Sequence, residues 1–113
     1  MRAILAGLAL FALAPARAEV PSLNDYPTAA RADYVFACMK TNGETRQALD
    51  QCSCSIDVIA SLIPYDAYVA GETVASLSQD IGPVGRTMNA TAKARDDLAT
   101  LRRAQAEAEV RCF

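Results

Sequence analysis

Apolar residues recur at steps of three and four over most of the chain after residue 27. This is the spacing of one face of an α-helix. The first such segment covers about residues 28–41 and is followed by Asn42-Gly43, a typical helix end. The second begins near residue 44 or 45 and ends before Pro64, because proline disfavours helical conformation in the residue ahead of it. The pattern therefore predicts two consecutive helices.

The second of these segments is apolar on two of its sides. The two stripes hold Leu49, Cys52, Ile56, Ile59 and Ile63 on one side, and Cys54, Val58 and Leu62 on another. Only one polar strip, made of Ser53, Asp57 and Ser61 at steps of four, runs along it. A helix that is apolar on two sides is typical of the centre of a domain. We therefore expect this helix to be the central, most buried one.

Two further helices are predicted in the second half of the chain. Pro64 suits the first position of a third helix, which we expect to end near Asp80. Gly71 weakens that prediction, because a glycine inside a helix costs about 1 kcal/mol relative to alanine. Residues 82–85, Gly-Pro-Val-Gly, are predicted to form a loop. Residues 91–111 are rich in helix formers, and the sequence therefore predicts an all-α domain of four helices.

The N-terminal segment has the features of a secretion signal. Arg2 is followed by an apolar run to Ala14 and by a small-x-small pattern that ends at Ala18. The run of about 12 apolar residues is shorter than the roughly 20 that a membrane-spanning helix needs. We therefore expect a signal peptide over residues 1–18, an extended leader over 19–27 and a helical domain over 28–113, with periplasmic localisation and no membrane association after cleavage.

Composition excludes several classes of function. The chain has 11 basic and 13 acidic residues, and the predicted cleavage removes two arginines and no acid. An acidic domain disfavours nucleic-acid binding, which needs clustered lysine and arginine. The chain contains no histidine. Ser-His-Asp and Cys-His catalysis, c-type haem attachment and histidine-ligated metals are therefore excluded.

Four cysteines, Cys38, Cys52, Cys54 and Cys112, follow the predicted signal, so two disulfides are the expected state. A helix places positions 52 and 54 about 200° apart, so their sulfurs point to different neighbours. One of these two cysteines should pair with Cys38 and the other with Cys112. The spacing leaves both pairings open, and we favour Cys38 with Cys54 and Cys52 with Cys112.

The Cys52-Ser53-Cys54 segment also permits a second interpretation, in which it is a thiol redox or Cu(I) site with Met39 and Met88 as soft partners. An active redox pair is expected at an exposed helix start beside basic residues. These cysteines instead continue the apolar stripes of their helix. Structural disulfides are therefore the favoured interpretation.

Oxygen ligands are the other candidate chemistry. We select Asp57, Asp66 and Glu72 as candidate ligands of a hard cation, although no EF-hand loop is present. Any such site has to assemble from separate helices or chains, and the simpler interpretation is that these are solvated surface acids. Tyr65, Tyr68 and Glu72 lie on one face of the third helix and form a candidate interaction surface. The alternative interpretation is that Tyr65 and Tyr68 are amphipathic side chains at the edge of the core.

Several segments together resemble a family of small periplasmic proteins from methylotrophic and related proteobacteria. They are Tyr34–Gly43 (YVFACMKTNG), Leu49–Asp57 (LDQCSCSID), Pro64–Tyr68 (PYDAY), Glu72–Val74 (ETV) and Leu101–Phe113 (LRRAQAEAEVRCF). The family is associated with PQQ-dependent alcohol dehydrogenase systems, and the pattern is similar to that of landiscernin-like lanthanide-binding proteins. This resemblance implies a non-enzymatic metal-handling protein whose lanthanide site uses carboxylates and lies between two chains.

Three functional hypotheses follow. The first is a non-enzymatic periplasmic accessory or binding protein that binds a lanthanide ion and supports a PQQ-dependent dehydrogenase, with a periplasmic oxidoreductase or a second copy of itself as partner. The second is a metal-independent structural or chaperone-like interaction module. The third is a thiol redox or Cu(I) carrier that uses Cys52 and Cys54.

Overall fold

The computed structural model describes residues 24–80 and 82–113. The predicted signal peptide and the first part of the predicted leader lie outside the described residues. The described chain forms five helices, α1 (Thr28–Asn42), α2 (Arg46–Leu62), α3 (Tyr65–Ser78), α4 (Pro83–Ala90) and α5 (Ala92–Cys112). Its secondary structure contains no strand, which confirms the all-α prediction.

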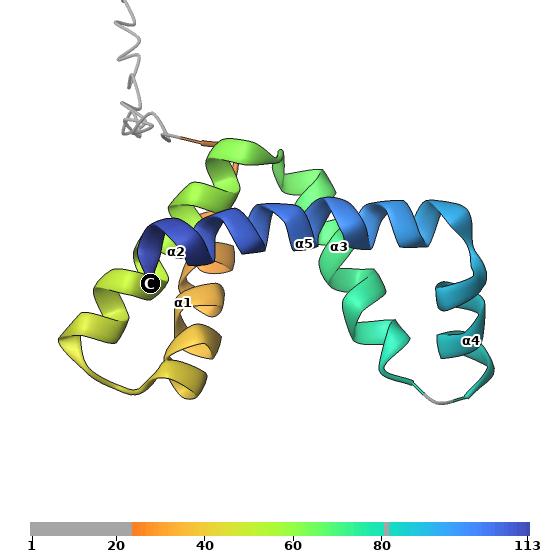
Figure 1. The fold of residues 1–113 in the computed structure, drawn as a ribbon, viewed down its shortest axis with the longest axis horizontal. Coiled ribbons are helices and arrows are strands. Elements are labelled where there is room, and N and C mark those ends of the chain that lie inside the picture. Colours follow the sequence, from red (N-terminus) through yellow and green to blue (C-terminus); the bar gives the residue numbers. More distant parts are fainter. Residues whose placement is uncertain (1–23, 81) are drawn as a thin grey trace, which may run out of the picture.

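The helices form two arms that are joined by α5. Figure 1 shows α5 as one long helix, with α1 and α2 near its C-terminal end and α3 and α4 toward its N-terminal end. Helix α5 packs against α2, α3 and α4, while α1 packs against α2. We call α1 with α2 the first arm and α3 with α4 the second arm. The expectation that α2 alone is central was therefore too simple, because α5 joins both arms.

The segment that begins at Pro83 is helical, which corrects the prediction of a loop over residues 82–85. Pro83 opens α4 at a position where its missing N–H leaves no hydrogen bond unmade. Pro64, predicted at the first position of the third helix, is instead the N-cap residue, and α3 begins one residue later at Tyr65. Gly85 is buried, and a side chain there would collide with the backbone carbonyl of Asp80. The helix that the sequence did not predict, α4, is therefore short and packs tightly against Asp80, which follows α3.

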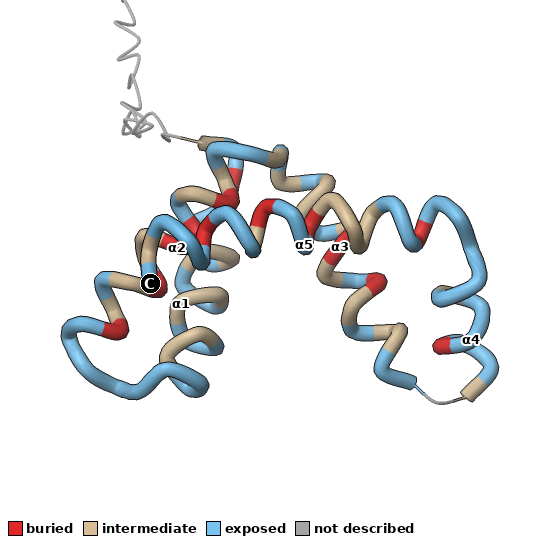
Figure 2. Tube along the Cα trace, in the orientation of Figure 1, coloured by how far each residue is buried: buried red, intermediate tan, exposed pale blue. Residues whose placement is uncertain are grey.

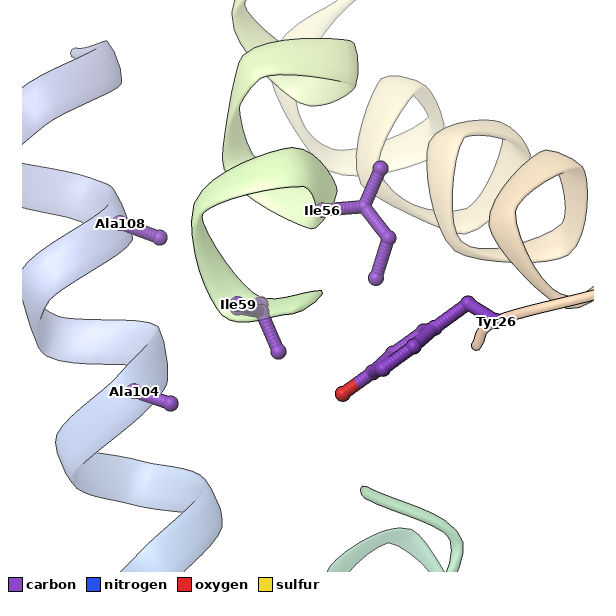
Figure 3. Close-up of a cluster of buried hydrophobic side chains, with 5 residues drawn as sticks. All are labelled: Tyr26, Ile56, Ile59, Ala104 and Ala108. Carbon is purple, nitrogen blue, oxygen red and sulfur yellow. The ribbon is translucent and has the colours of Figure 1, made fainter. Parts of the chain in front are cut away.

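The hydrophobic core lies between α2 and α5 and includes a residue from the predicted leader. Its central cluster contains Tyr26, Ile56, Ile59, Ala104 and Ala108. Figure 3 shows the two isoleucines of α2 pointing toward the Tyr26 ring, with the two alanines of α5 on the other side of α2. Small alanines let two helices approach closely, so one apolar stripe predicted for α2 meets α5 there.

The end of the leader is folded rather than extended. The Tyr26 side chain is only 2% exposed, and its hydroxyl donates to the Ile63 carbonyl over 3.0 Å. The neighbouring Asp25 accepts a 2.9 Å hydrogen bond from the backbone N–H of Tyr65, in the first turn of α3. Because the first N–H groups of a helix lack intrahelical partners, Asp25 caps α3 from a distant part of the chain.

Both predicted disulfides form, but with the pairing that we did not favour. The bonds join Cys38 to Cys52 and Cys54 to Cys112, with Cα–Cα distances of 5.8 Å in each. The first connects α1 to α2, and the second connects α2 to the end of α5. The angular separation of Cys52 and Cys54 correctly indicated two different neighbours. It did not tell which neighbour lies on which side, and α1 packs on the side of α2 that carries Cys52.

The two disulfides are typical of proteins from oxidising compartments. Among the described residues, no helix combines the length and apolar character that a membrane span requires.

Candidate functional site

A groove runs between the two arms along one side of α1. Its larger part, of about 430 Å³, lies between α1 and α3, and is lined by Asp33, Tyr34, Ala37, Cys38, Thr41, Asn42, Tyr68 and Glu72. A second hollow of about 300 Å³ shares four of these α1 residues and adds Ser55, Gln105, Glu109 and Phe113. Because the two hollows share a wall, we treat them as one feature, the inter-arm groove.

The first wall of the inter-arm groove is a single face of α1. Asp33, Ala37 and Thr41 follow one another at steps of four, and Tyr34 and Cys38 form the adjacent row. The Cys38–Cys52 disulfide holds this face against α2. The Tyr34 hydroxyl also shares a 2.9 Å hydrogen bond with the Ser55 hydroxyl of α2. This wall is therefore fixed both covalently and by a partly buried hydrogen bond.

The second wall carries two of the three residues of the predicted interaction surface. Tyr68 and Glu72 are one helical turn apart on α3 and both line the inter-arm groove. Tyr65 is not in its lining. Its ring stacks on that of Tyr68, with centroids 6.2 Å apart, and meets the Tyr26 ring edge-on at 5.2 Å. Tyr65 therefore supports Tyr68 from behind, in an aromatic cluster that the leader completes.

The inter-arm groove is acidic. Asp33, Glu72 and Glu109 line it, and neither hollow has a lysine or arginine in its lining. Burial raises the pKa of the Glu72 carboxyl above its usual value, and the positive charge of Arg102 on α5 partly opposes that shift. Burial also raises the pKa of the Tyr68 hydroxyl, so this hydroxyl is neutral at ordinary pH. Carboxylates, hydroxyls and side-chain amides thus face the same hollow.

The three predicted metal ligands lie in different places. Glu72 lines the inter-arm groove, whereas Asp57 lines a different groove, described below. Asp66 is exposed in the first turn of α3, where it accepts a 2.8 Å hydrogen bond from the Ala67 N–H. Within residues 24–80 and 82–113, no three acidic, cysteine or histidine side chains are grouped closely enough to hold a metal.

Sequence reasoning missed two acidic residues of the inter-arm groove, Asp33 and Glu109. Asp33 is four residues before Ala37 and eight before Thr41, and this spacing defines a face of α1. Glu109 belongs to α5, and lies near α1 because α5 packs against α2 and the Cys54–Cys112 bond ties its end to that helix. The spacing alone gave no sign that these faces meet.

A second groove, of about 520 Å³, lies between α1 and α2, and we call it the outer groove. It is lined by Thr28, Arg31, Ala32, Val35, Phe36, Met39, Ser53, Ile56 and Asp57. The α1 residues in this set differ from those of the inter-arm groove, so α1 presents one face to each. The outer groove is the more apolar of the two, and Phe36 at its edge is 66% exposed.

The Cys52-Ser53-Cys54 segment is not a dithiol. Both sulfurs are held in separate disulfides, and the structure has no free cysteine among the described residues. Met39 lines the outer groove of the first arm, whereas Met88 belongs to α4 in the second arm. The soft ligands proposed for Cu(I) are therefore neither free nor gathered in one place.

Comparison of the chain with protein-family models, with curated proteins and with solved structures gave no match.

Proposed function

We propose that this protein is a non-enzymatic periplasmic binding protein that takes a hard cation into its inter-arm groove. The observation that carries the proposal is the lining of this groove, where Asp33 and Glu72 face one hollow and Glu109 faces the adjoining one, without any lysine or arginine in either lining. Hard cations prefer oxygen ligands and carboxylates above all. A groove of this composition attracts a cation and disfavours an anion.

The arrangement of the carboxylates favours a large and highly charged ion. Asp33 and Glu72 belong to opposite walls, so one ion between them links the two arms. Because the described carboxylates do not converge as a group of three, the ion keeps several water ligands, as hard cations do in flexible sites. A cation also compensates the charge of Glu72, whose ionised form is disfavoured by burial.

A trivalent lanthanide is the specific ligand that we propose, and support of a PQQ-dependent dehydrogenase is the proposed role. These two details rest on the sequence resemblance to periplasmic proteins of methylotrophic bacteria. The acidic groove supports the cation class, and the two disulfides support an oxidising compartment such as the periplasm.

Titration of the chain lacking residues 1–18 with La³⁺ tests the proposal. We expect stoichiometric binding heat and a rise in melting temperature, because an ion at about 100 times its Kd stabilises the fold by about 2.7 kcal/mol. Glu72→Gln and Asp33→Asn should each weaken binding. Asp96→Asn, at an exposed position of α5 outside both hollows, is the matched control and should bind normally.

Asp57→Asn decides whether the ion occupies the inter-arm groove, because Asp57 was predicted as a ligand but lies in the outer groove. If Asp57→Asn removes binding while Glu72→Gln does not, the site is not the inter-arm groove. Absence of any La³⁺ response at stoichiometric metal contradicts the cation proposal as a whole.

A chaperone-like interaction module is the second candidate function. Its support is the outer groove, where the exposed Phe36 ring stands beside Val35 and Met39. Apolar surface of this kind binds unfolded segments of client proteins. Suppression of client aggregation by the metal-free protein, lost in Phe36→Ser, would favour this function. Aggregation unaffected by the protein at a several-fold excess argues against it.

A further inference from the structure

The outer face of α1 is unusually open for a helix of a small domain. Helix α1 contains no fully buried residue, and Figure 2 shows it in tan and pale blue along its whole length. Val35, Phe36 and Met39 lie on this face and line the outer groove, whose floor includes the buried Ile56 of α2. Apolar groups at a hollow with an exposed aromatic ring beside it are typical of a contact surface.

The outer groove also contains one charge of each sign without an ion-pair partner in the described chain. Arg31 comes from α1 and Asp57 from α2. The guanidinium of Arg31 makes one long hydrogen bond, of 3.5 Å, to the Thr28 hydroxyl, and its Nε is buried without a partner among the described residues. Asp57 is exposed and forms neither a hydrogen bond nor an ion pair with the part of the chain that the structure describes.

Two ion pairs hold other charged residues of the first arm, whereas Asp33, which lines the inter-arm groove, has no ion-pair partner among the described residues. Lys40 contacts Glu44 at 3.1 Å, and Arg46 contacts Asp50 at 3.2 Å, each across one helical turn. Arg31 and Asp57 differ from these residues because they share a groove and yet do not bind each other. Their opposite charges are thus both available to a molecule that occupies the groove.

We propose that a second copy of this chain docks on the outer groove by two-fold symmetry. A two-fold contact requires a surface that complements itself, so that residue i meets residue j and j meets i. The outer groove has the required parts. It contains a hollow and the exposed Phe36 ring, and it contains both a positive charge, Arg31, and a negative charge, Asp57. In the dimer, each Phe36 ring enters the groove of the other copy, and each Arg31 faces the Asp57 carboxylate of the other copy.

Charge distinguishes a second copy from other occupants. A partner segment of one charge sign pairs with either Arg31 or Asp57 and repels the other, whereas a second copy supplies both opposite charges at once. The Cys38–Cys52 disulfide ties α1 to α2, so both sides of the groove are held in position before association. The dimer also leaves the inter-arm groove free, because that groove is lined by a different face of α1.

Sedimentation equilibrium of the metal-free chain lacking residues 1–18, from about 1 µM to about 1 mM, tests this inference. We expect a reversible monomer–dimer equilibrium. Arg31→Asp and Asp57→Arg should each raise the dissociation constant about tenfold or more, because each places like charges opposite one another. The double variant Arg31→Asp/Asp57→Arg should restore it to near the wild-type value. Phe36→Ser should be monomeric throughout.

Arg95→Asp, an equal change of charge at an exposed position of α5, is the control and should leave the equilibrium unchanged. Circular dichroism and the absence of free thiols confirm that each variant folds, and recovery in the double variant is not explained by misfolding. A wild-type chain that stays monomeric at about 1 mM overturns the proposal. Single variants that dimerise normally, or a double variant that does not recover, overturn the pairing of Arg31 with Asp57. Because no metal is added, this test is independent of the La³⁺ titration.

Discussion

Gly71 of α3 lies directly against Leu101 of α5, and the two helices cross at this contact. A β-carbon added to Gly71 would be 2.6 Å from the Leu101 Cβ and 3.1 Å from the Asp97 carbonyl oxygen. Leu101 is fully buried and cannot move away easily. The glycine therefore does not interrupt α3, as its helix propensity suggested. It allows the second arm to reach α5.

Gly71→Ala should destabilise the protein, although alanine is the better helix former by about 1 kcal/mol. The added methyl group overfills the crossing of α3 and α5, and overpacking costs about 1–3 kcal/mol. Urea unfolding followed by circular dichroism measures the change. Ser76→Ala, at an exposed position of α3, should be neutral or slightly stabilising. A gain in stability from Gly71→Ala would show that the helices are not in such close contact.

The two disulfides should contribute unequally to stability. Cys38–Cys52 closes a loop with a sequence separation of 14, and Cys54–Cys112 closes one of 58. By the chain-entropy relation, these loops correspond to about 3 and about 4 kcal/mol. We therefore expect Cys54→Ala/Cys112→Ala to lower the free energy of unfolding more than Cys38→Ala/Cys52→Ala, once the cavity left at the buried Cys52 is allowed for.

The same cysteine variants test the pairing. Each matched double variant, in which both members of one disulfide become alanine, should contain no free thiol by alkylation and intact-mass measurement. Cys38→Ala/Cys54→Ala leaves Cys52 and Cys112, which face different neighbours in the structure. It should therefore show free thiols. Full protection in this variant together with free thiols in the matched pairs would support the pairing that the sequence favoured.

Tyr26→Phe should destabilise the fold by about 1 kcal/mol, because it removes the hydrogen bond to the Ile63 carbonyl. Tyr65→Phe is the matched control, since the Tyr65 hydroxyl donates no hydrogen bond within the described chain, and should have little effect. Thermal or urea unfolding at neutral pH measures both variants. Equal losses would mean that ring packing, and not the hydroxyl, dominates at Tyr26.

Tyr26→Phe should also make the stability less dependent on pH in the alkaline range. Burial, aided by the negative charges of Asp25 and Asp66, raises the pKa of Tyr26 from 10.0 to about 12. A raised pKa means that the contribution to stability is present below pH 10 and is lost as pH rises toward 12. Wild type should therefore lose more stability than Tyr26→Phe between these two values.

Glu72→Gln should stabilise the metal-free protein at neutral pH. Burial raises the pKa of Glu72 above 4.5, so its favourable contribution is present at lower pH and is lost as pH rises through the shifted value. The difference in free energy of unfolding between Glu72→Gln and wild type should accordingly grow as pH rises from 4.5 through the raised pKa of Glu72. Arg102→Gln should enlarge this loss of stability, because the positive charge of Arg102 opposes the rise in the pKa of Glu72. A difference that does not depend on pH would mean that Glu72 acts through packing.

Much of the fold was predictable because its helices carry regular apolar faces. The stripe from Leu49 to Ile63 placed α2 to within a few residues, and Pro64 marked the start of α3. The core residue Tyr26 was not predictable in this way. It is one aromatic side chain in a segment with two prolines, and no periodicity marks it as buried.

The candidate site was predicted only in part. Tyr68 and Glu72 were found because they share one face of one helix. Asp33 and Glu109 belong to other helices, and only the packing of the arms brings them to the same groove. The choice of disulfide partners failed for the same reason, since the spacing of Cys52 and Cys54 gives directions around α2 and not the positions of α1 and α5.

Both disulfides lie in or reach the first arm, whereas within residues 24–80 and 82–113 no disulfide connects the second arm to α5, against which it packs. Local unfolding starts where cross-links and buried contacts are fewest. Amide hydrogens of α3 and α4 should therefore exchange with solvent faster than those of α2, under conditions where the protein remains folded. One wall of the inter-arm groove is thus anchored covalently, whereas the other belongs to α3, whose close approach to α5 depends on Gly71.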